Sequence, residues 1–360
     1  ANKAVLGNDA LASNYIAEAR FIRGLCYYSL LTLYSRPFAD GAGSKLGVPL
    51  RLKAEKSDGG NDLARATVAE TYAQVLEDLN FAETNLPANY SSALLNTTRA
   101  HKNTAIALKT RVYLSMQRYN DVITEANKLV PTAAPFKAAS GVAHELQADI
   151  AKVFGPPHTT TESILSMPFT ENDLPGTQNG LGSYYNPGPR GIGDFSLNLT
   201  GAGIINNAAF NAGDARKKFT TTVGTKTYLN KFPLGPQHLD YAPVIRYAEV
   251  LLNAAEAIAR TSGVNDRAIA LLNAIRTRSD ASKTFTAADF ADTNAFIDAL
   301  LLERRMEFLG EGLRSLDCTR LLLPIPGKAN VATILPTQPD YIWPIPQGEL
   351  IANKLCVPNN

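Results

Sequence analysis

The chain has 360 residues, of which 45% are hydrophobic and 19% are charged. Its 35 lysines and arginines almost balance 33 aspartates and glutamates, and a net charge of +2 predicts no electrostatic attraction to nucleic acids or anionic membranes. The three cysteines form no CxxC pair, so their spacing predicts neither a zinc site nor a disulfide framework.

The first predicted elements are helices. Apolar residues recur at steps of three and four over residues 14–34, and this helix must end before Pro37, which has no N–H to donate. Cys26 lies among its apolar residues and is expected to be a small buried side chain. Thr67 and Glu70 have the spacing of a capping box, which predicts that a second helix begins at this point.

Two later segments have the layout of a helical hairpin. A helix over about residues 99–116 and another over about 120–129 carry small residues where the two helices must approach closely. Residues 247–278 repeat this layout, with Gly263 in the turn. Both segments resemble tetratricopeptide repeats. We therefore expect an all-α fold, a tetratricopeptide-like helical-repeat scaffold with a large irregular, loop-rich insertion.

The insertion is marked by its composition. Gly, Pro, Asn and Thr become frequent after residue 130, which is typical of loops and short strands. Because this stretch also holds aromatic residues, an ordered surface is favoured over disorder. The sequence thus predicts a helical part (1–130), an irregular ligand-binding insertion (131–242), a second helical part (243–322) and a wrapping tail (323–360). Trp343 in the tail is expected to be a structural plug.

We find no sequence pattern of a known catalytic centre. The histidines are isolated, and HExxH, GxSxG and Walker motifs are absent. Glu303 and Glu307 are one helical turn apart, and two carboxylates on one face could hydrolyse a glycosidic bond. However, Arg304, Arg305 and Arg314 are near in sequence and would lower the carboxylate pKa values, which disfavours a general acid. We interpret this stretch as a partly buried ion-pair lattice and expect no catalytic residue, metal site or cofactor.

A binding site has better support. Carbohydrate sites combine flat aromatic faces with amide and charged groups that bond to sugar hydroxyls. The segment TQNGLGSYYNPGPRGIGDF, residues 177–195, supplies both. We expect Tyr184 and Tyr185 to stack on sugar rings, and Asn179, Arg190 and Asp194 to form hydrogen bonds with the ligand. Alternatively, the adjacent tyrosines simply fasten the loop to the scaffold.

Five blocks follow one another along the chain: AEARFIRGLCYYSLLTLYSRPF, PVIRYAEVLLNAAEA, LLNAIRTR, LLERRMEFLGEGLRSLDCTR and YIWPIPQGEL. This ordered set resembles the SusD/RagB-like outer-membrane nutrient-binding lipoproteins of Bacteroidetes. The resemblance implies a non-catalytic, lipid-anchored cell-surface receptor that delivers oligosaccharides, or in some members peptides, to a TonB-dependent SusC-like transporter. The sequence has no lipoprotein signal or acylated cysteine at its start, so we expect a truncated N-terminus.

Two other hypotheses remain open from the residues alone. One is a helical-repeat adaptor that binds another protein on its concave surface. The other is a glycoside hydrolase that uses Glu303 and Glu307.

Overall fold

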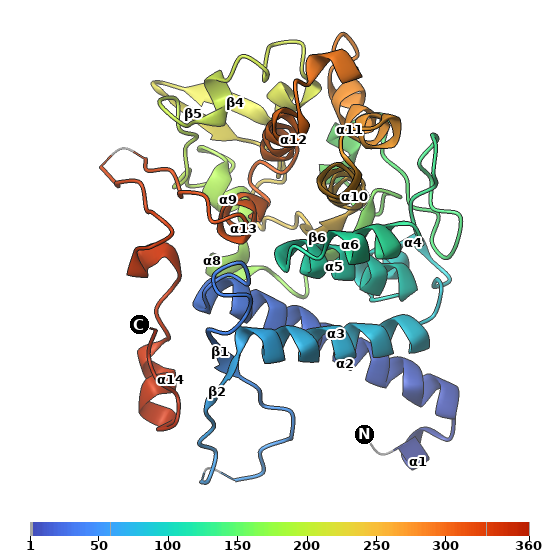
Figure 1. Cartoon of the computed structure of the whole chain (residues 1–360), viewed down its shortest axis with the longest axis vertical. Coiled ribbons are helices and arrows are strands. Elements are labelled where there is room, and N and C mark those ends of the chain that lie inside the picture. Colours follow the sequence, from blue (N-terminus) through green and yellow to red (C-terminus); the bar gives the residue numbers. More distant parts are fainter. Residues whose placement is uncertain (1–2, 58, 329, 360) are drawn as a thin grey trace. The chain divides into compact units, whose positions relative to one another are not determined.

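The computed structural model describes residues 3–57, 59–328 and 330–359, and most of its regular structure is helical (Figure 1). The α-helices are α1 (Lys3–Leu6), α2 (Asp9–Tyr34), α3 (Val68–Asn85), α4 (Ala93–Thr98), α5 (Lys102–Ser115), α6 (Tyr119–Ala126), α7 (Ala151–Phe154), α8 (Gly176–Asn179), α9 (Leu181–Tyr185), α10 (Tyr247–Ser262), α11 (Asp266–Ser279), α12 (Thr293–Glu307), α13 (Leu313–Arg320) and α14 (Gln347–Ala352). The 3-10 helices are η1 (Ile204–Asn206), η2 (Ala215–Phe219), η3 (Ala287–Asp289) and η4 (Pro339–Tyr341).

The named strands form antiparallel two-stranded sheets. The pairs are β1 (Leu46–Pro49) with β2 (Arg65–Thr67), β3 (Ser163–Met167) with β6 (Ala242–Arg246), and β4 (Thr220–Val223) with β5 (Lys226–Leu229). The chain divides into two compact units. Unit 1 contains residues 1–86, 112–118 and 315–360, and unit 2 contains residues 87–111 and 119–314.

In unit 1, α2 and α3 lie side by side (Figure 1). Helix α2 begins earlier than predicted, at Asp9, because the Asn8 side chain caps it and accepts the Leu11 N–H at 3.0 Å. The predicted capping box at α3 is confirmed. The Thr67 hydroxyl accepts the Glu70 N–H at 3.1 Å, and the Glu70 carboxylate accepts the Thr67 N–H at 2.8 Å.

Close packing and one ion pair join these two helices. A Cβ added at Gly24 would lie 3.4 Å from Leu79 of α3, so the glycine lets the helices approach. Arg23 donates two hydrogen bonds, of 2.7 and 2.6 Å, to the buried Asp78 carboxylate. The prediction for Cys26 is wrong: the side chain is exposed. Two residues along a helix span about half a turn, so Cys26 points away from the face that Gly24 packs on α3.

The tail of unit 1 is fastened to the segment before β2. The Asn353 amide donates to the Leu63 carbonyl and its oxygen accepts the Leu63 N–H, both at 2.8 Å. Trp343 is not the internal plug that we expected. It is 61% exposed and meets the Tyr34 ring edge-on, with centroids 6.2 Å apart. Side chains alternate along extended backbone, and Ile342 takes the buried side.

In unit 2, α6, α11 and α12 all pack on α10 (Figure 1). Every residue of α10 from Tyr247 to Ala259 is buried, which accounts for its apolar composition. The predicted hairpin over residues 247–278 is confirmed, and Gly263 in its turn has a positive φ of 75°.

The predicted helix over residues 99–116 corresponds to α5, which begins at Lys102, and the sequence analysis did not predict the short helix α4 that precedes it. Arg99 is extended and ends α4. The Thr104 hydroxyl then accepts the His101 N–H at 3.3 Å where α5 begins. The turn between α5 and α6 includes Gln117, whose φ is 57°. The sequence pattern therefore located the helical hairpin but not the short helix before it.

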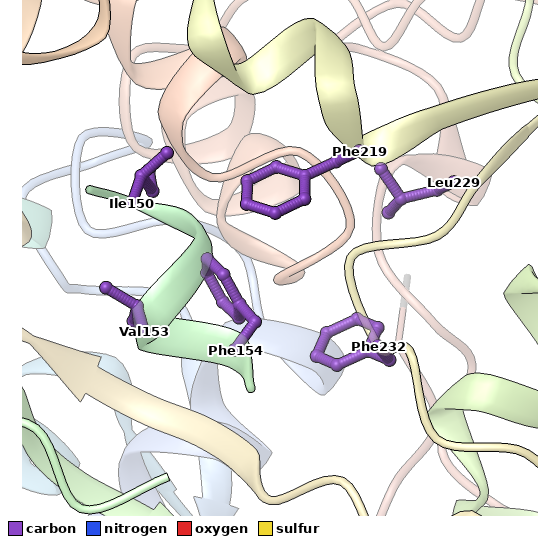
Figure 2. Packing of buried hydrophobic residues seen from close by; sticks show 6 residues of the cluster. All are labelled: Ile150, Val153, Phe154, Phe219, Leu229 and Phe232. Carbon is purple, nitrogen blue, oxygen red and sulfur yellow. The ribbon is translucent and has the colours of Figure 1, made fainter. Parts of the chain in front are cut away.

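A cluster of aromatic rings lies under the irregular part of unit 2. Phe154 meets the edges of Phe219 and Phe232, with centroids 5.4 and 6.1 Å apart (Figure 2). Leu229 from the β4–β5 hairpin and Ile150 belong to the same buried cluster (Figure 2). Such edge-on pairs add about 0.5–1.5 kcal/mol each beyond the area that they bury. The predicted ligand segment packs on this cluster through Leu181 and Tyr185.

Candidate functional site

The predicted ligand segment forms two short helices and a returning stretch in unit 2. After α8 and α9, the chain turns at residues 187–191 and runs back along α9. The Ile192 N–H donates to the Ser183 carbonyl at 2.8 Å, and the Phe195 N–H donates to the Tyr184 carbonyl at 3.2 Å. The return places Phe195 beside the two tyrosines of α9.

The two tyrosines have different surroundings. The Tyr184 ring stacks on Phe195, with centroids 5.5 Å apart and an interplanar angle of 29°. Tyr185 instead lies between Phe195 and the buried Phe232, 5.9 Å from each, and burial raises the pKa of its hydroxyl. Because Phe195 is 54% exposed, Tyr184 and Phe195 form an aromatic surface, which we call the aromatic face. Tyr185 supports this face from the core side.

Backbone contacts hold the aromatic face in place. A Cβ added at Gly191 would lie 2.5 Å from the carbonyl oxygens of Asn186 and Ser183, so the turn requires glycine there. The buried Asn186 amide donates to the carbonyls of Gly182 at 2.9 Å and Phe232 at 2.6 Å. The rings are therefore fixed before a ligand arrives, which lowers the entropic cost of binding.

The predicted polar residues are exposed. Arg190 and Asp194 lie in the return loop that carries Phe195, whereas Asn179 ends α8. The structure thus brings Arg190 and Asp194 into the same loop as the aromatic face. The sequence analysis did not select Phe195, or Ile192, which is 65% exposed. The glycines of GIGDF indicate a tight return of the chain onto the preceding helix, and this signal could have identified both Phe195 and Ile192.

A buried acid lies beside α9. A Cβ added at Gly182 would be 3.1 Å from the Asp240 carboxylate and 3.2 Å from Nδ1 of His238. Burial raises the pKa of Asp240 to about 7, although the Leu234 N–H bond of 3.1 Å opposes the shift. A carboxyl group in contact with the base of α9 therefore changes charge near neutral pH.

The carboxylates that a hydrolase would need are buried in ion pairs. Glu307 accepts hydrogen bonds from Arg278 at 2.7 Å, Arg246 at 2.9 Å and Arg216 at 3.2 Å. Burial alone would raise the pKa of Glu307, but these guanidinium groups outweigh it and hold the pKa well below its usual range. Glu303 is equally buried and lies 2.6 Å from Arg216. Both acids belong to one lattice of ion pairs.

The lattice confirms the ion-pair interpretation, and the arginines that chiefly lower the pKa of Glu307 are Arg278, Arg246 and Arg216. Arg304 donates to Asn253 at 2.8 Å, and Arg305 donates to the Ala202 carbonyl at 2.6 Å. The partners come from distant segments because α12 is surrounded by the irregular region, β6 and α11. The members of the lattice are Glu162, Asp214, Arg216, Lys231, Arg246, Arg276, Arg278, Asp280, Glu303, Glu307 and Glu311.

Comparison with known proteins identifies the family. The model of the SusD family matches residues 205–360, and a model described as starch-binding and associating with the outer membrane matches residues 7–114. A solved SusD superfamily protein from Bacteroides fragilis is 31% identical, with a TM-score of 0.83 over 95% of this chain and 76% of that one. The chain belongs to the SusD family.

Other members share this SusD fold at lower identity. SusD-like protein P2 of Formosa agariphila is 24% identical over all of this chain and 76% of its own length. A putative sugar-binding protein from Bacteroides vulgatus has a TM-score of 0.79 and 22% identity, over 97% of this chain and 78% of that one. A laminarin-binding SusD-like protein has a TM-score of 0.71 and 22% identity, over 98% and 79%. Within the described ranges, no helix combines the length and hydropathy that crossing a membrane requires.

Proposed function

We propose that this SusD-family protein captures oligosaccharides on the aromatic face of Tyr184 and Phe195. The observation that carries the proposal is the stacked pair of the half-buried Tyr184 ring of α9 and the exposed Phe195 ring, beside a loop that also presents Arg190 and Asp194. Aromatic faces bind the apolar faces of sugar rings, and charged or amide groups beside them bond to hydroxyls. Arg190, Asp194 and Asn179 would supply these bonds, and Tyr185 would hold the face in position. The sugar-binding and laminarin-binding relatives support this ligand class.

The surroundings of Glu303 and Glu307 favour binding without catalysis. A glycosidase needs one carboxyl group with a raised pKa and room for substrate between two carboxyl groups. Arginines instead lower the pKa of Glu307, and both side chains are almost completely buried. We therefore assign them to the scaffold.

The remaining parts of the proposal concern the whole protein. We place it at the cell surface, lipid-anchored in the outer membrane, where it would deliver its ligand to a TonB-dependent SusC-like transporter. The family description as starch-binding and associating with the outer membrane supports this location. The hairpins α5–α6 and α10–α11 would be degenerate tetratricopeptide-like repeats. The irregular residues 131–242 would be the ligand-binding insertion of this scaffold.

Calorimetry with laminarin oligosaccharides, other neutral glycans and peptides tests the binding site. We expect Tyr184→Ala and Phe195→Ala each to weaken glycan binding by about 1–3 kcal/mol, as for a stacking anchor, without lowering the melting temperature appreciably. Tyr185→Ala should mainly lower the melting temperature, since its ring packs on Phe232. Val223→Ala, an exposed apolar change in the β4–β5 hairpin, is the matched control.

Three results would count against the proposal. Unchanged glycan affinity in both aromatic variants would place the site elsewhere. Binding of peptides alone would change the ligand class. Release of new reducing ends that Glu307→Gln abolishes in folded protein would restore the hydrolase hypothesis.

A further inference from the structure

Unit 1 contains a cavity that the aromatic face does not explain. Its volume is about 700 Å³, within the range of about 300–1,000 Å³ that is usual for small-molecule sites. The cavity lies between residues 36–46, the start of β2 and the tail residues 337–342 and 358–359. Its described lining mixes apolar residues such as Leu46 and Ile342 with hydroxyl and amide groups, among them Ser44, Gln338 and Asn359.

Arg65 forms one wall of the cavity, and within the part of the chain that the structure describes its buried guanidinium bonds to neutral groups alone. The Arg65 guanidinium donates to the carbonyls of Gly47 at 2.7 Å, Leu46 at 3.1 Å, Val357 at 3.1 Å and Pro358 at 3.3 Å. Carbonyl oxygens accept these four hydrogen bonds, but they are dipoles and do not cancel the charge of Arg65. Burial accordingly lowers the pKa of Arg65. A buried charge that no described anion pairs with favours a negative group nearby.

Two more cations line the same cavity. Arg36 donates to Asp40 at 2.6 Å and to the Pro336 carbonyl, so its charge is already balanced by one carboxylate. Lys45 is exposed at the edge. Among the described lining residues, the positive charges of Arg36, Lys45 and Arg65 therefore exceed the single negative charge of Asp40. The cavity carries a positive field on a chain whose total charge is close to zero.

We propose that this cavity is a second carbohydrate site, and that it binds an acidic sugar through a uronate carboxylate or a sulfate ester placed near Lys45 and Arg65. The hydroxyl and amide groups of the lining would bond to sugar hydroxyls, and Leu46 and Ile342 would contact the C–H faces. The inference deepens the proposed glycan binding and rests on it for the class of ligand. The cavity shares no residue with the aromatic face, so an experiment can refute either binding site and leave the other standing.

Calorimetry with the full chain tests the site, using short oligogalacturonates, a sulfated galactan oligosaccharide, laminarin oligosaccharides and a polyglutamate peptide. We expect the uronate or the sulfated probe to bind, and binding to weaken as salt rises. Lys45→Glu reverses a charge on an exposed side chain and should reduce that affinity about tenfold or more. Lys56→Glu makes the same change in net charge on another exposed lysine of unit 1 and should leave the affinity unchanged. Phe195→Ala should also leave it unchanged.

The outcomes separate the two sites and the two anions. Binding of one acidic probe alone identifies the anion as carboxylate or sulfate. If folded protein binds neither acidic probe, the cavity proposal is overturned, whatever the laminarin result. The same holds if Lys45→Glu has no effect, if Phe195→Ala removes acidic binding, or if polyglutamate binds equally well. Loss of laminarin binding in Phe195→Ala, with acidic binding intact, would support both sites.

Discussion

A pair of stacked histidines makes the stability of unit 2 depend on pH. His101 and His144 are buried, with ring centroids 5.3 Å apart and an interplanar angle of 18°. Nε2 of His101 lies 3.1 Å from the Asn96 carbonyl, and Nδ1 of His144 lies 3.0 Å from the Thr161 carbonyl. Burial, together with the nearby His144, lowers the pKa of His101 to about 3, and burial lowers the pKa of His144 to about 4.

The expected loss of stability follows from these values. Both rings stay neutral in the folded protein at pH 5, whereas each takes up a proton in the unfolded chain, where its pKa is about 6.5. The unfolded state then binds more protons, so stability falls as pH falls below about 6.5. Between pH 8 and pH 5 each histidine costs about 2 kcal/mol, and the pair costs about 4 kcal/mol.

Urea unfolding of the wild type and of His101→Gln/His144→Gln at pH 8, 7, 6 and 5 isolates this effect. Both proteins share all other titrating groups, so the difference between their pH profiles belongs to the pair. We expect the wild type to lose about 4 kcal/mol more than the double variant over this range, and His144→Gln alone to recover about half of it. Parallel profiles, within about 1 kcal/mol, would refute the reasoning.

Three further changes test other parts of unit 2. Glu307→Gln removes one buried carboxylate that three arginines share and should cost about 3–5 kcal/mol of unfolding free energy in urea, whereas the exposed Glu171→Gln should cost almost nothing; equal effects would contradict the lattice. Asp240→Asn should stabilise the protein by about 2 kcal/mol more at pH 8 than at pH 5, because a carboxyl pKa raised to about 7 makes wild-type stability fall as pH rises from about 4 to about 7; a gain that is the same at both pH values would exclude this cause. Gly191→Ala should disturb the aromatic face and lower glycan affinity more than Gly235→Ala, where an added Cβ meets open space; calorimetry compares them.

Local signals predicted the helical scaffold. The capping box of Thr67 and Glu70 involves residues three apart, and the hairpin around Gly263 needs only helical periodicity and one glycine. The lattice could not be predicted in the same way, because the partners of Glu307 are 29, 61 and 91 residues distant. The acidic and basic residues of the α12 segment indicated that it forms ion pairs. The tertiary fold decides which they are.

The candidate site shows the same division. Tyr184 and its neighbour Tyr185 were predicted together, since composition does not distinguish adjacent aromatic residues. In α9 they point in different directions, one toward Phe195 and the other toward Phe232. Phe195 joins the face only because the chain returns along α9. The role of Arg65 also depends on distant partners, which lie in the last residues of the chain.

The division of the chain has a consequence for biosynthesis. Unit 1 is interrupted, since residues 315–360 follow the whole of unit 2 along the polypeptide. A ribosome that adds about 5–20 residues per second releases α2 and α3 early, but Asn353 reaches Leu63 only after some 290 more residues have been made. Unit 2 completes its sequence first. Helices α2 and α3 therefore emerge before unit 2 but belong to the unit that closes after it, so the surfaces that residues 315–360 cover stay open while unit 2 is made.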